Sequence, residues 1–137
     1  MTRWIYLFFV ILISCSGDKN PTKLYIASMS DLSTFEQEQI NEAVQLINEG
    51  AGTTFFGFSG NRPVDIKSAN LDGIKTGYSK PQTFLCEIYI DSNSDLIRAT
   101  PELIQYVFIH ELGHCFGLDY SSDPNSVMYP TFTGTWD

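Results

Sequence analysis

The chain has 137 residues, 43% of them hydrophobic and 14% aromatic, so it is long enough and apolar enough to form one packed domain. Its 16 acidic and 8 basic side chains give a net charge of −8, which excludes a surface built to bind nucleic-acid phosphates. We interpret this acidity as ordinary solubility, and we expect a monomer with no nucleic-acid partner.

The N-terminal segment differs from the rest of the chain. Arg3 precedes an apolar run from Ile5 to Ile13, which is too short to cross a bilayer as a helix and is typical of a secretory signal. The letters LISC at 12–15 resemble the lipobox of bacterial lipoproteins. This resemblance implies that Cys15 is lipidated and that the protein contacts the membrane through its lipid anchor alone. The alternative is an ordinary cleaved signal with an incidental cysteine.

These signals divide the chain into three parts. We expect a signal peptide at 1–15, a tether at 16–23 and the folded domain at 24–137. Lipidation predicts an exported lipoprotein of a bacterial outer membrane, facing either the periplasm or the cell surface. Ser16, which stands where an aspartate would favour the inner membrane, agrees with this assignment. An ordinary cleaved signal predicts a secreted protein instead.

The folded part begins with a strand and an amphipathic helix. The letters LYIAS at 24–28 alternate between apolar and polar residues, as strands do. Residues 33–50 predict a helix with one apolar face. Ser33 and Glu36 fit a capping box at its start, and Gly50 fits the position just past its end.

The middle of the chain predicts a sheet. Apolar runs separated by glycine and proline predict four more strands, at 53–58, 64–69, 74–80 and 84–91. Pro81 follows the third of these, so we expect 74–80 to be a short edge strand. A sheet with helices packed against it gives a mixed α/β chain of the α+β class.

A second helix is predicted at 100–118. Thr100 is a plausible N-cap and Pro101 suits the first helical position, while Gly117 fits the left-handed residue just past the helix end. The helix carries His110 and His114, which lie one turn apart on one face and can reach the same zinc ion. Glu111 borders that face without being a ligand, and it can take a proton from a water molecule that zinc activates.

The remaining cysteines form an even pair. With Cys15 assigned to lipid, Cys86 and Cys115 remain, and an even count in an exported domain permits one disulfide. The alternative is two buried free thiols.

The stretch HELGHCFGLDYSSDPNSVMYP, at 110–130, resembles the zinc-binding helix and Met-turn of the metzincins, and among them the matrixins. The resemblance implies a metzincin-like zincin fold: a twisted sheet of about five strands with an antiparallel edge strand, a backing helix and an active-site helix. Met128 would form a floor under the metal. An extended protein or peptide substrate would pair with the edge strand at 76–80, and residues 130–133 would wall the pocket for the side chain after the scissile bond. The family's closing helix is expected to be missing, because the chain ends at Asp137.

One position departs from that resemblance. The family's third zinc ligand stands three residues after the glycine, where this chain has Tyr120. No other histidine exists beyond the two on the helix, and no glutamate follows Glu111. We rank Tyr120 first as the third ligand, Asp119 second, and a two-histidine site completed by water third. Tyr120 packed on the loop without binding metal is the structural alternative.

The cofactor prediction is therefore one catalytic zinc ion. A second, structural zinc is not expected, because Tyr89 occupies one of the positions where the family has a histidine. Structural calcium near Asp72, Asp91 or Asp95 is a weaker expectation, and solvated loop acids are the alternative.

Two function classes follow from these residues. The first is a zinc-dependent endopeptidase with Glu111 as general base and acid. The second is a catalytically inactive surface lipoprotein of the same fold that binds proteins or peptides, which the lost third histidine favours and the retained Glu111 disfavours. A housekeeping lipoprotein with an accidental motif would leave the helix caps, the glycine and Met128 without a common cause.

Overall fold

The computed structural model describes residues 24–51, 57, 60–72 and 75–130. The predicted signal peptide, Cys15 and the tether lie outside the described residues, and so do residues 131–133 of the expected pocket wall. Among the described helices, none is both long enough and apolar enough to cross a membrane.

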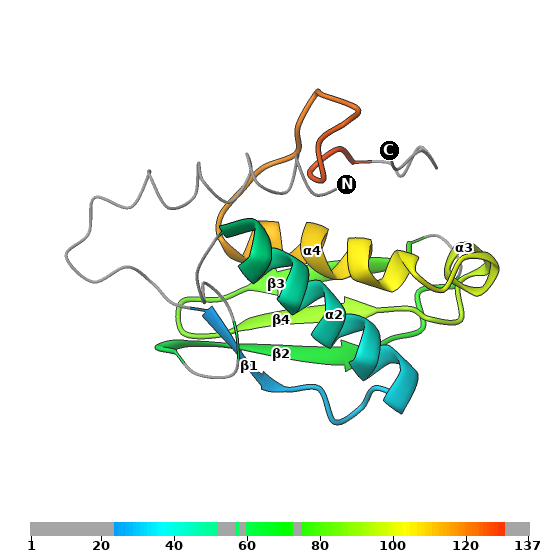
Figure 1. Cartoon of the computed structure of the whole chain (residues 1–137), viewed down its shortest axis with the longest axis horizontal. Helices are drawn as coiled ribbons and strands as arrows, with labels where there is room; N and C mark the ends of the chain where they lie inside the picture. Colours follow the sequence, from blue (N-terminus) through cyan, green and yellow to red (C-terminus); the bar gives the residue numbers. More distant parts are fainter. Residues whose placement is uncertain (1–23, 52–56, 58–59, 73–74, 131–137) are drawn as a thin grey trace.

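Four strands form one mixed sheet in the order β1-β2-β4-β3 (Figure 1). Strand β2 (Arg62–Ser68) pairs in parallel with β1 (Leu24–Ser28) on one side and with β4 (Cys86–Ile90) on the other. Strand β3 (Gly77–Pro81) lies at the edge and runs antiparallel to β4. The α+β class and the antiparallel edge strand are therefore confirmed.

The expected fifth strand is only partly within the described residues. Of the run 53–58, the structure describes Gly57 alone. Gly57 forms an isolated parallel bridge with Tyr25, and its carbonyl accepts a hydrogen bond from the backbone N–H of Ile26 at 2.8 Å. The described sheet thus has four strands, and Gly57 pairs with the free edge of β1 at a single position.

Helix α2 (Thr34–Ala51) starts where the sequence predicts. The backbone N–H of Ser33 donates to the Glu36 carboxylate at 2.6 Å, and the Glu36 N–H donates to the Ser33 hydroxyl at 3.3 Å, which completes the capping box. The predicted end is wrong, because the helix continues through Gly50 to Ala51. Gly50 is buried, so tertiary packing holds this last turn against the poor helix propensity of glycine.

The second predicted helix, 100–118, is confirmed over a shorter range, and a short helix that the sequence did not predict precedes it. A short helix α3 (Asp95–Ala99) is capped by Ser94, and Thr100 is its C-cap. Helix α4 (Leu103–Cys115) follows after one turn, so the assignment of Thr100 as the N-cap of the long helix is wrong. The Thr100 carbonyl accepts the Leu103 N–H at 3.0 Å, which joins the two helices through a tight turn instead.

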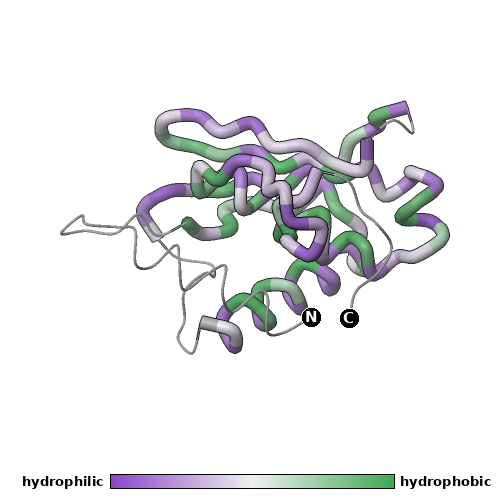
Figure 2. Tube along the Cα trace, turned by 90° about the horizontal axis from the view of Figure 1, so that it is seen from above, coloured by the Kyte–Doolittle hydropathy of each residue, from purple (hydrophilic) through white to green (hydrophobic). Residues whose placement is uncertain are grey.

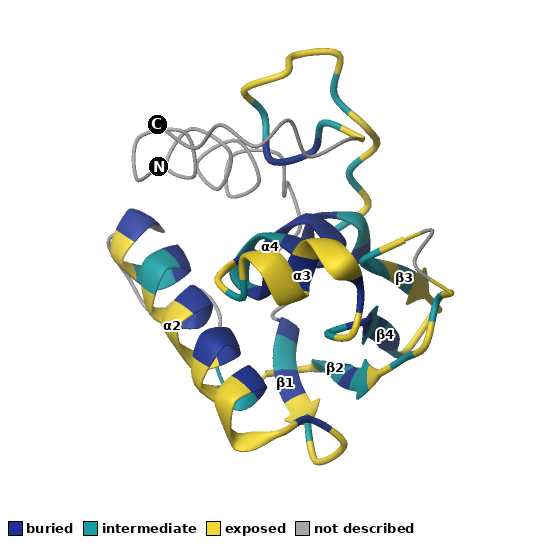
Figure 3. Cartoon of the chain, turned by 90° about the vertical axis from the view of Figure 1, so that its right-hand side faces the viewer, coloured by how far each residue is buried: buried dark blue, intermediate teal, exposed yellow. Residues whose placement is uncertain are grey.

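Helices α2 and α4 pack on the same face of the sheet and against each other (Figure 1, Figure 3). Hydrophobic and hydrophilic residues are interspersed along the helices and strands (Figure 2). Most residues of α4 are buried. Phe108, Leu112 and Met128 are among the largest fully buried side chains. The helix that carries the zinc motif is therefore anchored in the core of the domain.

Candidate active site

A cleft of about 740 Å³ runs between the edge strand β3, helix α4 and the chain that follows α4. Its walls bring together the sequence-predicted residues of α4 and the loop after it: His110, Glu111, His114, Asp119 and Tyr120. The edge strand contributes Gly77, Tyr78, Ser79 and Pro81, and Thr76 just before it also lines the cleft. The cleft therefore places the predicted metal-binding face beside a strand whose outer edge is unpaired among the described strands.

The two histidines of α4 lie side by side in this cleft. Their four-residue spacing puts both on one helix face, and their ring centres are 4.9 Å apart. Two imidazoles that bind one zinc through nitrogens about 2.0–2.1 Å away place their ring centres about 5 Å apart. The observed spacing fits a shared metal ion.

Hydrogen bonds fix which nitrogen of each ring carries the proton. Nδ1 of His110 lies 2.6 Å from the Val127 carbonyl oxygen, and Nδ1 of His114 lies 2.7 Å from the Leu118 carbonyl oxygen. A carbonyl oxygen can only accept, so each Nδ1 donates and each Nε2 is left with a free lone pair. Nε2 of His114 is buried without a hydrogen-bond partner. This arrangement is the one that metal-ligating histidines adopt.

The environment of His110 also favours the neutral ring. His110 is buried, and burial lowers the pKa of its imidazole. The Val127 carbonyl and the charge of Glu111 act in the opposite direction but do not outweigh burial. A neutral imidazole is the form that binds metal ions, so burial keeps His110 in the form that a metal ligand needs.

The end of α4 is built to present the Leu118 carbonyl to His114. Gly117 has φ +88°, the left-handed conformation predicted for it. The Gly117 N–H donates to the His114 carbonyl at 2.9 Å and the Leu118 N–H donates to the Gly113 carbonyl at 3.1 Å, which is a Schellman motif. The turn that ends the helix therefore also orients one candidate metal ligand.

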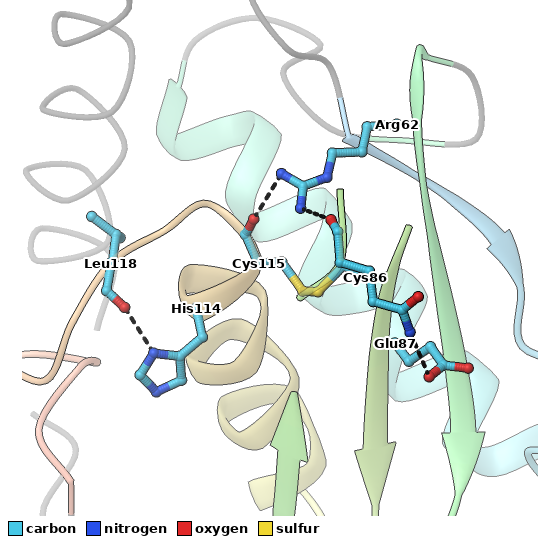
Figure 4. Close-up of a disulfide and its surroundings, with 7 residues drawn as sticks. Arg62, Cys86, Glu87, His114, Cys115 and Leu118 are labelled. Atoms are coloured by element: carbon cyan, nitrogen blue, oxygen red, sulfur yellow. Dashed lines mark hydrogen bonds between the residues drawn. A yellow bond between two sulfur atoms is a disulfide. The ribbon is translucent and has the colours of Figure 1, made fainter. Parts of the chain in front are cut away.

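Cys86 and Cys115 form a disulfide that joins the start of β4 to the end of α4 (Figure 4). The cysteine count had left this pairing open. The Arg62 guanidinium strengthens the same junction, because it donates to the Cys115 carbonyl at 3.4 Å and to the Gln82 carbonyl at 2.7 Å. Cys115 directly follows His114, so these contacts fix the helix end that carries the second histidine.

Glu111 is buried, with 8% of its surface exposed, and it lines the cleft between the histidines and β3. A carboxylate at this position can take a proton from a water molecule in the cleft and return it to a leaving group. A Cβ atom added at Gly77 would lie 3.8 Å from Cγ of Glu111. Glu111 therefore lies next to the edge strand.

Gly77 allows this close contact of α4 with β3. A Cβ at this position would lie 2.5 Å from Cγ1 of Val107 and 2.7 Å from the Tyr89 carbonyl oxygen. Both distances are too short for a side chain, so only glycine fits. Sequence reasoning missed this role, because a single glycine in a strand is also typical of a bulge or a turn.

Tyr120 lies over both imidazoles. Its ring centre is 4.9 Å from that of His114 and 5.8 Å from that of His110, and the side chain is 64% exposed. Asp119 also lines the cleft and is exposed. Among the described residues, no group of three His, Cys, Asp or Glu side chains is placed to hold a metal ion. A third ligand from this set, Asp119 included, is therefore not positioned beside the two histidines.

The loop after α4, residues 118–130, is held by its own hydrogen bonds. The Asp123 carboxylate accepts from the Asn125 N–H at 2.9 Å, and the Ser121 N–H donates to the Met128 carbonyl at 2.9 Å. Met128 is 2% exposed. Its role as a floor under the metal stays a prediction.

The expected calcium ligands Asp72, Asp91 and Asp95 do not form a metal-binding group in the described part of the chain. Asp91 is buried, and its carboxylate accepts from the N–H groups of Leu71 at 2.8 Å and Asn93 at 3.1 Å. Asp91 thus acts as a structural acceptor that ties two loops together.

A further cleft residue escaped the sequence analysis. Tyr106 stands one helical turn before His110, so the same four-residue spacing could have placed it in the cleft. Its hydroxyl lies 3.5 Å from the Tyr129 carbonyl, and burial raises the pKa of the phenol to about 12. Tyr106 is therefore a neutral phenol on the cleft wall.

Comparison with known proteins agrees with this geometry. A family model described as Matrixin matches residues 30–136, which is most of the chain. The chain belongs to the matrixin family. This assignment supports a metalloprotease-type domain of the α+β class.

Curated relatives match over a short segment. Human matrilysin is 63% identical over 27 residues, and matrilysin of Felis catus is 69% identical over 26 residues. Macrophage metalloelastase of Oryctolagus cuniculus is 58% identical over 26 residues. These segments cover 19–20% of this chain but only 6–10% of the length of those relatives. The likeness is thus strong in one stretch.

Proposed function

We propose that the protein is a zinc-dependent endopeptidase. The observation that carries this proposal is the pair of imidazoles at 4.9 Å, each with its Nδ1 bound to a backbone carbonyl and its Nε2 left for a metal. Glu111 lies beside them in a cleft that borders an edge strand. The matrixin membership favours this function over the inactive binding module.

His110 and His114 would hold the zinc ion through their Nε2 atoms. When bound, zinc supplies a Lewis acid that makes water a nucleophile near neutral pH and polarises a carbonyl. Hydrogen bonds from the two Nδ1 atoms to Val127 and Leu118 keep both rings oriented for this task.

The other residues of the cleft would act on the substrate. An extended peptide can pair with the outer edge of β3, which sets the scissile bond beside α4. The Glu111 carboxylate takes the proton of the attacking water and passes it to the leaving amine. Its burial removes competing solvent and strengthens its electrostatic contacts.

Tyr106 and Tyr129 form part of the cleft wall next to α4. The neutral phenol of Tyr106, held by the Tyr129 carbonyl, limits the depth available to a substrate side chain. Both belong to the proposed substrate site, while Met128 supports the loop from inside the core.

The location of the enzyme is part of the proposal. The N-terminal 1–15 signal and lipobox favour export with lipid attached at Cys15. Metabolic labelling with a radioactive fatty acid is expected to mark the wild-type chain and not Cys15→Ser. Equal labelling of both chains would contradict lipidation at Cys15.

Hydrolysis of a fluorogenic peptide by Glu111→Gln tests the function directly. We expect kcat/KM to fall by about 10²- to 10⁴-fold, the usual contribution of a general base. Zinc content should stay unchanged, because Glu111 is not a ligand. Glu102→Gln is the matched control, since Glu102 is exposed at the other end of the same helix. Equal activity of the two variants would contradict the proposal.

A further inference from the structure

We infer that Tyr120 is the third protein ligand of the metal, bound through its phenolate oxygen, so that the site has two nitrogen donors and one oxygen donor. This inference rests on the proposed metal site and specifies its composition. The family resemblance leads one to expect a third imidazole, and the chain has none to offer.

The positions of the three rings support this set. The ring centres of His110, His114 and Tyr120 are separated by 4.9, 4.9 and 5.8 Å, so all three rings lie around one point in the cleft. Ligand bonds of about 2.0–2.2 Å from zinc to nitrogen or oxygen would place a phenolate ring about 5 to 6 Å from each imidazole. The observed separations lie close to this range.

The free nitrogen of His114 adds a second observation. Nε2 of His114 is buried and makes no hydrogen bond, although the Tyr120 ring lies 4.9 Å from the imidazole. A phenol that served only to satisfy this histidine would donate its hydroxyl to that nitrogen. No such bond forms, so this nitrogen keeps its lone pair for a metal ion.

The backbone holds Tyr120 in this place from both sides. Before it, Leu118 is fixed by its N–H to the Gly113 carbonyl and by its own carbonyl to His114. After it, the Ser121 N–H donates to the Met128 carbonyl. The tyrosine is nevertheless 64% exposed, so apolar burial does not explain why its ring points at the histidines.

A phenolate also changes the charge of the site. Two neutral imidazoles and one phenolate would leave a charge of +1 on a bound divalent ion, whereas three imidazoles would leave +2. Imidazole and oxygen donors suit zinc and copper(II). The site should accordingly bind either ion, and the bound phenolate should be visible by spectroscopy.

Metal titration of the purified, metal-free protein tests this inference. Zinc is expected to produce the ultraviolet difference spectrum of an ionised tyrosine, saturating at one ion per chain. Copper(II) is expected to produce a visible phenolate-to-copper charge-transfer band. Neither spectrum depends on peptide hydrolysis. An inactive protein could therefore still show tyrosinate binding, and the two claims can fail separately.

Variants identify the residue responsible. Tyr120→Phe should abolish both spectra and weaken zinc binding by more than about 100-fold, because outer-shell partners of a metal already contribute about 10- to 100-fold. Tyr120→His should restore tight zinc binding without the tyrosinate spectrum. Tyr25→Phe, on β1 and outside the cleft, is the matched control and should behave as wild type.

Two results would overturn the inference. One is wild-type zinc affinity and unchanged spectra in Tyr120→Phe, which would make the tyrosine a bystander. The other is loss of zinc binding in Asp119→Asn with retention in Tyr120→Phe, which would make the neighbouring aspartate the ligand. Melting temperatures of the metal-free variants should match wild type, because both side chains are exposed and their loss should not unfold the domain.

Discussion

Helix α4 and the loop after it, residues 118–130, contribute opposite halves of the candidate site. The histidines and Glu111 stand on a helix buried in the core and joined to the sheet by a disulfide. Tyr120 stands on a loop, with most of its side chain in solvent. The two histidines and the glutamate of the family motif are on the helix, and the departure from the motif is on the loop.

This difference explains how the candidate site can accommodate a tyrosine where the family has its third histidine. The positions of His110 and His114 follow from helix geometry and from carbonyl partners, so neither depends on the side chain at 120. The loop has its own turns around Asp123 and Ser126, which fix its path independently of the metal. Changes on α4 should therefore cost the site more than changes on the loop.

Removal of a helix ligand gives the largest expected effect. His114→Ala should reduce zinc affinity by well over about 100-fold, because it removes a ligand and not merely its outer-shell partner. Zinc content after dialysis and peptide hydrolysis should both fall to background. Glu102→Ala, at the exposed start of α4, should retain both. Full zinc occupancy in His114→Ala would contradict the assignment.

Loss of the disulfide is expected to come next. Cys86→Ser with Cys115→Ser should lower the free energy of unfolding by about 2–4 kcal/mol, since the bridge closes a long loop in the unfolded chain. Denaturant unfolding with and without a reductant measures this. The reductant should destabilise wild type and leave the double variant unchanged. Equal free energies of unfolding for wild type and the double variant without reductant would show that the bridge does not stabilise the fold.

The contact between α4 and β3 should be sensitive to one methyl group. Gly77→Ala should destabilise the domain by about 1–3 kcal/mol through overpacking against Val107 and the Tyr89 carbonyl. Hydrolysis should fall as well, because the cleft lies at this contact. Gly57→Ala is the matched control, since an added Cβ there meets nothing within 4 Å. Equal melting temperatures for wild type and Gly77→Ala would contradict the close contact between α4 and β3 at Gly77.

The capping box of α2 should give the smallest effect, since it lies far from the metal-binding face. Glu36→Gln keeps a capping-box hydrogen bond but loses the negative charge at the helix N-terminus, so it should lower stability by about 0.3–1 kcal/mol at neutral pH. Burial raises the pKa of the Glu36 carboxyl. Its hydrogen bonds with Ser33 and Ser92 together outweigh burial, so the net pKa lies below the ordinary 4.5.

The pH dependence follows from that direction. The unfolded chain binds the proton more readily, so the contribution of Glu36 is present above its unfolded pKa and disappears as pH falls through the folded value. Melting temperatures in an acidic pH series should thus converge for wild type and Glu36→Gln. Glu38→Gln, exposed on the same helix, should not show this convergence. A constant difference down to low pH would rule out the carboxylate as its source.

The sequence predicts α4 well and the rest of the site less well. Periodicity and the Gly117 cap place His110 and His114 on one face because helix geometry alone determines it. The sequence does not predict that the carbonyls of Leu118 and Val127 accept hydrogen bonds from the histidine Nδ1 atoms, because those contacts depend on the path of the loop.

The missed features depend on tertiary contacts in the same way. Thr100 ends α3 instead of starting α4. The sequence analysis did not predict α3, since a five-residue helix is too short to show a helical repeat. From the sequence alone, Arg62 would be expected to lie on the surface without a specific partner. Only the fold brings its guanidinium to the Cys115 carbonyl. The capping box was predictable because its two partners are three residues apart.

Hydrolysis of a fluorogenic peptide through one cycle of chelation and zinc addition tests the central claim most directly. The account predicts that removal of the metal abolishes the activity of the wild-type protein and that one equivalent of zinc per chain restores it. Activity that persists at the same rate in metal-free protein, with zinc content verified by elemental analysis, would contradict the claim that His110 and His114 hold a catalytic zinc ion.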